Sequence, residues 1–415
     1  MDIRKRTNKT PWPVAMILLE VGTLLSVTGG AAAQFCEYEA TVIRYPLECA
    51  FGEVQTLVNG LNDGGWIVGT YWCPIWPDKR PFYRTPEGDY VDFGLVAGSY
   101  EVVPADINNT GQICGYAQMS SKGPRGFIYE IATGEWTIIE SVDLEIGRSY
   151  ATAINDAGQV CGERTLGPWV SPRSAFLRNA KGDILDMGVS TTIGLDINAE
   201  GVVVGRYATT IDLGGEAFIW DGANVTWLGP VPNGMTSGAS GINDLGTVTT
   251  TGLPDHEGSR SESFLWDADF MHQVPLLPGY VGVTVSDINI QSQVTGRCFE
   301  PDLNLETAIL WQAGTTYPLD SIVTNPEVGS LESSLAINRD GEILVEGHDS
   351  ANNIIGFLIQ PLDSSPADAD GDCDSDVWDL LRLLQDWGQS VSPTDFDGSG
   401  AVDVSDLLLL LANWG

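Results

Sequence analysis

The chain has 415 residues, with 56 acidic against 20 basic side chains and a net charge of −36. Nucleic acids and anionic membranes are bound mainly through basic side chains, so this charge excludes both as expected partners. Only 18% of residues are charged while 48 are Gly, a balance typical of many turns between short strands rather than of a coiled coil. We therefore expect a mainly β protein.

The first 33 residues have the pattern of an export signal. Four basic residues precede an apolar stretch from Val14 to Val27, and three Ala residues stand immediately before Gln34. The alternative is an uncleaved anchor helix, in which Glu20 would interrupt the apolar stretch. No later segment is apolar for 18 residues, so no other membrane span is expected. We predict a signal peptide at 1–33 and a secreted or cell-surface location, where disulfide bonds can form.

A short pattern occurs seven times along the middle of the chain, which indicates a repeat fold. It reads [IL]-N-x-x-G-x-[IV]-x-G, and its anchor Asn residues are 46, 47, 43, 45, 46 and 49 positions apart. The Gly three places after Asn is replaced only in the sixth copy, by Ser292. The anchor residues are Asn62, Asn108, Asn155, Asn198, Asn243, Asn289 and Asn338.

Each copy has the residues of a hairpin. Asn bonds its own backbone to begin a turn, and Gly three places later takes a positive φ at no steric cost. A second apolar and aromatic run follows, such as 217–220, and in most copies a Gly-containing turn and one further strand come after it. Four strands in ~40 to 50 residues are the size of a propeller blade. We predict a seven-bladed β-propeller of four-stranded blades at 34–362.

The ends of the repeat region suggest how the ring closes. The last copy stops at Pro361 with its fourth strand missing, and an unassigned strand at 38–45 precedes the first copy. We expect this N-terminal strand to complete the last blade, because that leaves no open strand edge at the seam. The alternative is an open, curved solenoid.

The Asn-x-x-Gly-x-Val-x-Gly and Ala-Phe-Leu-Trp segments resemble the HAF repeats of exported bacterial proteins. The resemblance covers residues 38–360 in short stretches. Thr250 and Val345 stand where the closing Gly is expected, so the fifth and seventh blades match least well. The resemblance implies export and a propeller-like array, with no established chemistry.

No residue is predicted to be catalytic. The sequence has no nucleophile elbow, phosphate loop or His-Glu-x-x-His motif. His256, His272 and His348 are far apart in the sequence and are expected to be surface residues rather than catalytic bases. Two acids at a propeller mouth would suffice for a glycosidase, but the sequence places no such pair within reach.

The seven Cys are an odd number, so at least one is unpaired within the chain. Cys36 with Cys49 is the better local candidate for a disulfide. Cys114 and Cys161 have equivalent positions in consecutive copies, and we expect them to lie too far apart, because a disulfide needs Cα atoms within ~7 Å.

The C-terminal 53 residues contain twelve Asp and one Arg, a density of negative charge that packs only when a cation compensates it. Segments 368–379 and 395–406 align at an offset of 27 and place side-chain oxygens at the ligand positions of a calcium loop. A solvated acidic tail is the alternative, but it does not explain the interleaved Leu and Trp. The predicted ligands of two Ca²⁺ sites are Asp368, Asp370, Asp372, Asp374, Asp376 and Asp379 in the first loop, and Asp395, Asp397, Ser399, Ala401, Asp403 and Asp406 in the second.

Each loop leads into a Leu-rich helix that ends in Trp-Gly, at Trp387 and Trp414. Position 12 is Asp rather than the Glu of the common EF-hand, and Cys373 stands where Gly is usual. Loop and helix, twice, with Asp at position 12, resemble a dockerin. The resemblance covers 368–415, after a linker at 363–367, and implies a cohesin-like or envelope protein as partner.

The sequence thus predicts an exported, non-enzymatic propeller for binding or display, attached to the envelope or an extracellular complex through a small α-helical calcium-loop module. The alternative is an enzyme or carbohydrate-binding subunit in polysaccharide degradation, because dockerins as a family carry such cargo. Trp72, Trp76 and Trp169 are the candidates for stacking on a glycan at a propeller mouth. Convergent acids at one mouth would favour the enzyme, and a hydrophobic lining would favour binding only.

Overall fold

The computed structural model describes most of the chain after residue 35. The described residues are 36–49, 52–73, 79–141, 147–165, 173–208, 215–232, 236–253, 261–267, 270–300, 303, 305–323, 325, 328–362, 365, 367–369, 371, 373 and 375–414. The predicted export signal lies outside them. Over these ranges, no helix has the length and apolar character needed to cross a bilayer.

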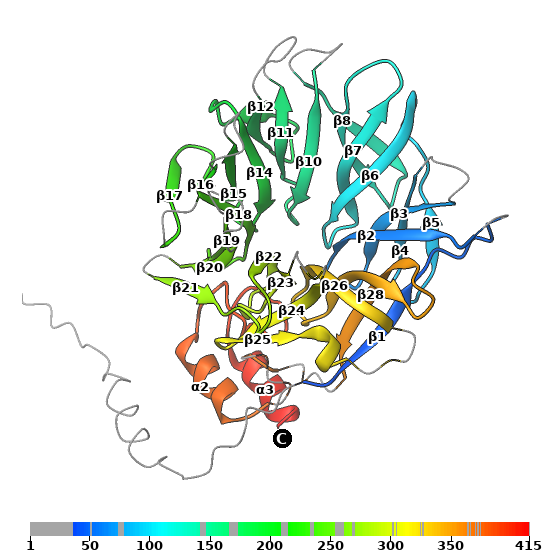
Figure 1. Cartoon of the computed structure of the whole chain (residues 1–415). Coiled ribbons are helices and arrows are strands. Elements are labelled where there is room, and N and C mark those ends of the chain that lie inside the picture. The colour runs from blue at the N-terminus through cyan, green and yellow to red at the C-terminus, as the bar shows by residue number, and fades with distance from the viewer. Residues whose placement is uncertain are drawn as a thin grey trace, which may run out of the picture. The chain divides into compact units, whose positions relative to one another are not determined.

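Seven antiparallel four-stranded sheets form a ring, which confirms the predicted seven-bladed β-propeller (Figure 1). The first strands of neighbouring blades contact one another and line the centre of the ring.

Blades 1 to 4 consist of β2 (Gln55–Leu61), β3 (Ile67–Trp72), β4 (Arg80–Arg84) and β5 (Tyr90–Asp92); β6 (Ser99–Ile107), β7 (Gln112–Met119), β8 (Arg125–Glu130) and β9 (Glu135–Ile139); β10 (Ser149–Ile154), β11 (Val160–Thr165), β12 (Arg173–Arg178) and β13 (Ile184–Asp186); and β14 (Thr192–Ile197), β15 (Val203–Ala208), β16 (Gly215–Trp220) and β17 (Val225–Gly229). Blades 5 to 7 consist of β18 (Thr236–Ile242), β19 (Val248–Leu253), β20 (Glu262–Trp266) and β21 (Met271–Val274); β22 (Gly282–Ile288), β23 (Val294–Glu300), β24 (Leu305–Gln312) and β25 (Thr315–Pro318); and β26 (Val328–Ile337), β27 (Ile343–Asp349), β28 (Ile354–Pro361) and the N-terminal β1 (Tyr38–Ile43).

The anchor Asn residues form the turns between the first and second strands, as predicted. The side-chain oxygen of each anchor accepts the backbone N–H four residues later, at 2.8 to 3.0 Å. The residue three places after the anchor takes a positive φ in all seven blades, between 71° and 82° for the six Gly and 64° for Ser292. Ser292, the one exception to Gly at this position, therefore adopts the same left-handed conformation as the six Gly.

The closing Gly of the pattern lies close against the backbone of the first strand, beside a bulge. Each first strand shifts register just before the anchor, between Val58 and Gly60 in blade 1. A Cβ on Gly69 would lie only 2.1 Å from the backbone oxygen of Leu57, and the equivalent contact is 2.0 to 2.2 Å in four other blades. Blades 5 and 7, which have Thr250 and Val345 at this position, keep the same four-stranded pairing.

The aromatic run of each repeat packs between blades. Phe82, Phe127, Phe176 and Phe218 are all fully buried, in clusters that combine residues of two neighbouring sheets. Burying such a side chain contributes about 1.5–3 kcal/mol, so these contacts are the main attraction between blades.

The N-terminal strand completes the last blade, as predicted. β1 pairs antiparallel with β28, and residues 38–43 lie opposite residues 361–356. Blade 7 is therefore built from both ends of the repeat region. The alternative fold, an open solenoid, is wrong, because the first and last blades also contact each other through β2 and β26.

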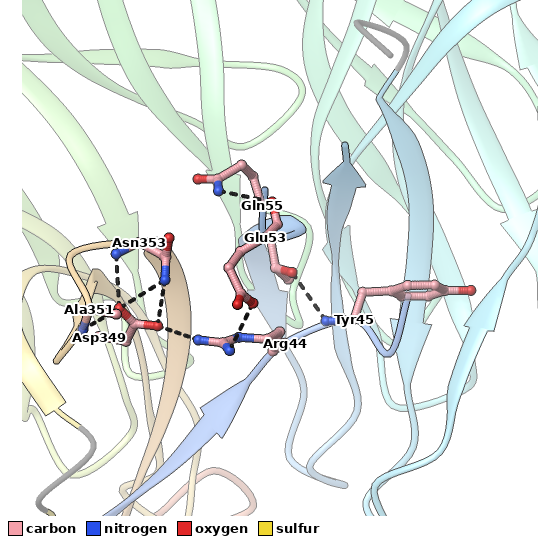
Figure 2. A network of polar contacts seen from close by, with 8 residues as sticks. Arg44, Tyr45, Glu53, Gln55, Asp349, Ala351 and Asn353 are labelled. Atoms are coloured by element: carbon pink, nitrogen blue, oxygen red, sulfur yellow. Dashed lines mark hydrogen bonds and ion pairs between the residues drawn. The ribbon is translucent and has the colours of Figure 1, made fainter. Parts of the chain in front are cut away.

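An ionic contact follows directly after β1. Arg44 pairs with Glu53, which precedes blade 1, and with Asp349 at the end of β27. Figure 2 shows that Asp349 is held in place by the side chain of Asn353 and the N–H of Ala351. The two ends of the repeat region are thus joined by strand pairing within blade 7 and by an ion pair.

Two short helices, α2 (Val377–Gln385) and α3 (Val404–Ala412), follow the predicted loops. Asp376 and Asp403 cap their N-termini, and the side chains of Asp379 and Asp406 complete the two capping boxes. A small core joins the helices, formed by Ala367, Leu383, Val402 and Leu410. A 3-10 turn, Leu319–Ser321, lies between β25 and β26.

Candidate functional site

The second predicted calcium loop brings three of its ligands together. Carboxylate oxygens of Asp395, Asp397 and Asp406 all lie within 4.8 Å of one another. The Asp395 carboxylate also accepts the N–H of Gly400 at 2.9 Å, which curls the loop around it. Oxygen donors gathered by a curled loop are the coordination that Ca²⁺ prefers. This donor set fits the predicted cation.

The remaining predicted ligands of this loop lie beside the three carboxylates. Ser399 donates its hydroxyl to the backbone oxygen of Ala401 at 3.3 Å. The Asp403 carboxylate accepts the N–H of Ser405 at 2.7 Å and so serves as the helix cap. Position 9 of a calcium loop often acts through water, which is compatible with this second role of Asp403.

The first loop repeats the backbone contacts of the second. Asp368 accepts the N–H of Cys373 at 2.7 Å, as Asp395 does for Gly400. Cys373 has a φ of 73° and Gly400 one of 83°, so the Cys at the turn position adopts the left-handed conformation for which Gly is usual. Three predicted ligands, Asp370, Asp372 and Asp374, lie outside the described residues.

The disulfide prediction was wrong. Cys36 bonds to Cys373 of the first predicted calcium loop, and Cys49 bonds to Cys73. The reason is the closure of the ring. Cys36 directly precedes β1, and the start of β1 lies opposite Pro361, where the C-terminal segment leaves the propeller. The other thiols, Cys114, Cys161 and Cys298, are buried and free, so the expectation that the first two do not bond is confirmed.

The first loop is also fixed to blade 6. The Gln312 side chain donates a hydrogen bond to the backbone oxygen of Gly371. A cavity of about 360 Å³ lies beside this contact, and its lining includes Asp368 and Asp395, the first ligands of the two loops, together with Arg339 of blade 7. Both predicted calcium loops thus border the propeller.

The two helices leave large apolar side chains exposed. Three pairs of them correspond by the offset of 27, among them Trp387 and Trp414, which are 47% and 46% exposed. Such a concentration of exposed apolar side chains marks an interaction surface in soluble proteins. We call it the helix patch; it consists of Val377, Trp378, Leu384, Trp387, Val404, Leu408, Leu411 and Trp414.

Three Asp residues on the first strands join the blades in pairs. Asp106 of blade 2 accepts the N–H of Ile107 at 2.8 Å and that of Ile154 in blade 3 at 2.9 Å. Asp196 does the same for blades 4 and 5, and Asp287 for blades 6 and 7. We call these three residues the channel acids, because they stand on the strands that line the centre of the ring.

Sequence reasoning missed the channel acids, although a signal was present. The residue two places before each anchor Asn alternates between Asp and a small residue. In chain order these residues are Gly60, Asp106, Ala153, Asp196, Gly241, Asp287 and Ala336. The small residue makes room for the Asp of the following blade, since a Cβ on Gly60 would lie 2.9 Å from the Cα of Asp106.

The channel acids have raised pKa values. Burial raises the pKa of Asp106 to about 7 and that of Asp196 to about 6. Burial, with the charges of Asp196 and Asp106, raises the pKa of Asp287 to about 8. The hydrogen bonds that these carboxylates accept from backbone N–H groups lower the three pKa values, but they are too weak to cancel the effect of burial.

The far end of each blade, opposite the anchor turns, carries variable polar side chains. The residue eight places after the anchor Asn differs from blade to blade, whereas the turn residues are retained. Its occupants in chain order are Thr70, Tyr116, Glu163, Arg206, Thr251, Arg297 and Glu346. The mouth at this end is therefore polar and charged, and it lacks the hydrophobic lining that was expected to favour binding only.

Of the three histidines, His348 lies near this mouth and His272 on the surface. His348 is half-buried, and its Nδ1 lies 2.8 Å from Glu332, whereas His272 is mostly exposed near Asp267. Burial and the Glu332 charge raise the pKa of Glu346, two residues before His348. His256 lies outside the described residues.

Of the tryptophans proposed for glycan stacking, only Trp72 is described. It is half-buried, and the Lys79 ammonium lies over its ring at 5.2 Å from the centroid. Trp76 and Trp169 lie outside the described residues.

No family model and no curated protein matches the sequence. Solved structures with a similar fold include the β-propeller domain of the Trilobed protease from Pyrococcus furiosus, at 9% identity and a TM-score of 0.49 over 73% of this chain and 95% of that one. A puromycin hydrolase mutant is similar at 11% identity and a TM-score of 0.49, over 74% of this chain and 53% of that one. The Aleuria aurantia lectin is similar at 10% identity and a TM-score of 0.34, over 74% and 90%. These proteins are similar to the chain in their propeller fold.

Proposed function

We propose that the chain is an exported, non-enzymatic propeller for binding or display, held on the envelope or in an extracellular complex by its calcium-loaded C-terminal module. The observation that carries this proposal is the helix patch, which lies on two short helices whose N-terminal caps are predicted calcium ligands. The cation would fix the loops, and the loops would fix the helices that present the patch.

The size of the module supports this role. Its buried core is limited to a few side chains, and a segment of about 50 residues gains little stability from its own core. Calcium and the disulfide to Cys36 supply what the core lacks. Eight large apolar residues nevertheless remain exposed, at a cost in solubility that a docking partner would explain.

A carbohydrate-binding subunit is the second candidate function. The observation in its favour is the charged and polar mouth, because saccharides are recognised by convergent polar groups beside aromatic rings. This role would reside in the propeller and the attachment role in the module, so the two are compatible.

The attachment role can be tested by cell fractionation of the full chain. The exported protein should remain with the envelope or complex fraction in calcium and be released by chelator. Leu408→Glu in the helix patch should cause release in calcium, while Leu185→Glu, which changes an exposed Leu on the propeller, should not. Release of both variants to the same extent, or retention that ignores chelator, would show that the module is not the attachment device.

A further inference from the structure

We infer that the far mouth of the propeller contains a binding site for an acidic saccharide, built from Glu163, Arg173, Arg206 and Arg148 with Tyr116 and Tyr150. This inference rests on the proposed role of the propeller as the binding part of the chain and names the chemistry of its ligand. We call these six residues the mouth cluster.

Glu163 is the centre of the cluster. Its side chain is 8% exposed, and one carboxylate oxygen pairs with Arg173 at 2.5 Å. The other oxygen, Oε2, is buried and has no hydrogen-bond partner among the described residues. A buried acceptor without a partner costs about 1–3 kcal/mol or more for a charged group, so the position favours a donor supplied from outside.

Positive charge surrounds Glu163 in excess of what the carboxylate needs. Burial raises the pKa of Glu163, while the charges of Arg173, Arg206 and Arg148 act to lower it, which places all three guanidinium groups near the carboxylate. Arg173 alone neutralises Glu163. The exposed side chain of Arg206 makes no ion pair with a described residue, although the chain has 56 acidic side chains.

Two aromatic rings complete the cluster. Tyr116 of blade 2 and Tyr150 of blade 3 meet edge to face, with centroids 5.0 Å apart. Tyr150 lies directly opposite Glu163 in the strand pairing of blade 3, and its hydroxyl interacts with Arg148. A half-buried aromatic surface thus adjoins the carboxylate and the guanidinium groups.

The arrangement selects a particular ligand chemistry. Guanidinium groups bind carboxylates in strong, charge-assisted hydrogen bonds. An unpaired acceptor in the middle of these groups requires a hydroxyl or amide donor close to the ligand's anionic group. A uronic acid carries a carboxylate and hydroxyls on one ring, whose apolar face can lie on Tyr150. An acidic peptide has amide donors, but an aspartate or glutamate side chain has no ring whose apolar face can lie on Tyr150, so it fits less well.

The repeat itself provides the control. Arg297 has the same place in blade 6 that Arg206 has in blade 4, but it is paired with Glu306 at 3.0 Å. Replacing Arg297 therefore makes the same chemical change at an equivalent position that lacks the cluster.

Isothermal titration of the full chain with trigalacturonic acid, in chelator so that calcium cannot bridge the ligand, tests the site. We expect binding by the wild-type protein, weakening as salt rises. Arg206→Gln should weaken it at least about tenfold, the loss typical of a charge-assisted hydrogen bond. Arg297→Gln should change it little, and O-methylated trigalacturonate, which lacks the hydroxyl donors, should bind more weakly than the parent.

Four results would overturn the inference: no binding of trigalacturonate, equal binding of a neutral galactose trimer, equal binding of hexaglutamate, or equal loss in the two Arg variants. Circular dichroism and the unfolding midpoint establish that each variant is folded. The attachment test depends on calcium and on the helix patch, so its failure is distinguishable from a failure here.

Discussion

The side-chain amide of Asn338 in blade 7 donates a hydrogen bond of 3.2 Å to the backbone oxygen of Asn62 in blade 1, 276 residues away. It is the last of seven such bonds, in which every anchor Asn donates to the backbone of the next anchor around the ring. The anchors thus form one closed circle. Each has two roles: its oxygen shapes the local turn, and its nitrogen joins two blades.

We predict that Asn243→Ala destabilises the propeller by about 1–3 kcal/mol, because it removes the bond to blade 6 and leaves the N–H of Thr247 without its acceptor. The carbonyl of Asn289 keeps the bond from the N–H of Ser292. Chemical unfolding followed by tryptophan fluorescence measures the change. Asn224→Ala, in an exposed turn of blade 4, is the matched control and should have a much smaller effect. Equal effects of the two changes would show that the circle contributes nothing beyond an ordinary turn.

The channel acids should make stability fall as pH rises. The carboxyl of Asp287 has a pKa of about 8 in the folded chain and about 4 in the unfolded chain, so the folded state binds more protons between these values. Its contribution is therefore greatest below pH 4 and is lost as pH rises toward 8. We expect Asp287→Asn to flatten the decline of the unfolding midpoint between pH 4 and 8. Asp183→Asn, on an exposed turn, should keep the wild-type slope, and an unchanged slope in both would contradict the assignment.

Calcium should order the second loop and the helix that follows it. The carboxylates of Asp395, Asp397 and Asp406 repel one another until a cation binds, and a ligand present at 100 times its Kd stabilises the bound form by about 2.7 kcal/mol. We predict that amide hydrogen exchange in α3 slows on addition of calcium. In Asp406→Asn the protection of α3 should be lost while that of β-strands is kept. Exchange in α3 that is the same with calcium and with chelator would exclude a metal site in this loop.

The disulfide between Cys36 and Cys373 should couple the first loop to the closing strand. It spans 337 residues of sequence, and removal of a native disulfide typically costs 2–5 kcal/mol. We predict that Cys36→Ser speeds proteolysis after β28 and weakens calcium binding in the first loop, with the second loop unaffected. Cys73→Ser, which opens the shorter loop to Cys49, serves as the control. Calcium titration with unchanged affinities in Cys36→Ser would show that the loop does not depend on the bond.

The sequence by itself determined the blade. Turn, bulge and strand are local structures, and Asn155, Gly158, Val160 and Gly162 specify them through hydrogen bonds and steric limits within a few residues. Seven equal copies then predict a ring, and the missing fourth strand predicts closure by β1. The acidic positions of 368–406 likewise follow a spacing that can be counted without coordinates.

Only the tertiary structure decided which distant groups meet. Cys36 bonds to Cys373 rather than to Cys49 because β1 pairs along the last blade. The carboxylate of Asp106 accepts the N–H of Ile154 because the packing of blades 2 and 3 brings the two residues together. The buried oxygen of Glu163 and the excess of Arg around it depend on the packing of three blades. Contacts between blades join residues as far apart as Asn62 and Asn338, 276 positions from each other. Their partners are set by the twist and packing of the sheets.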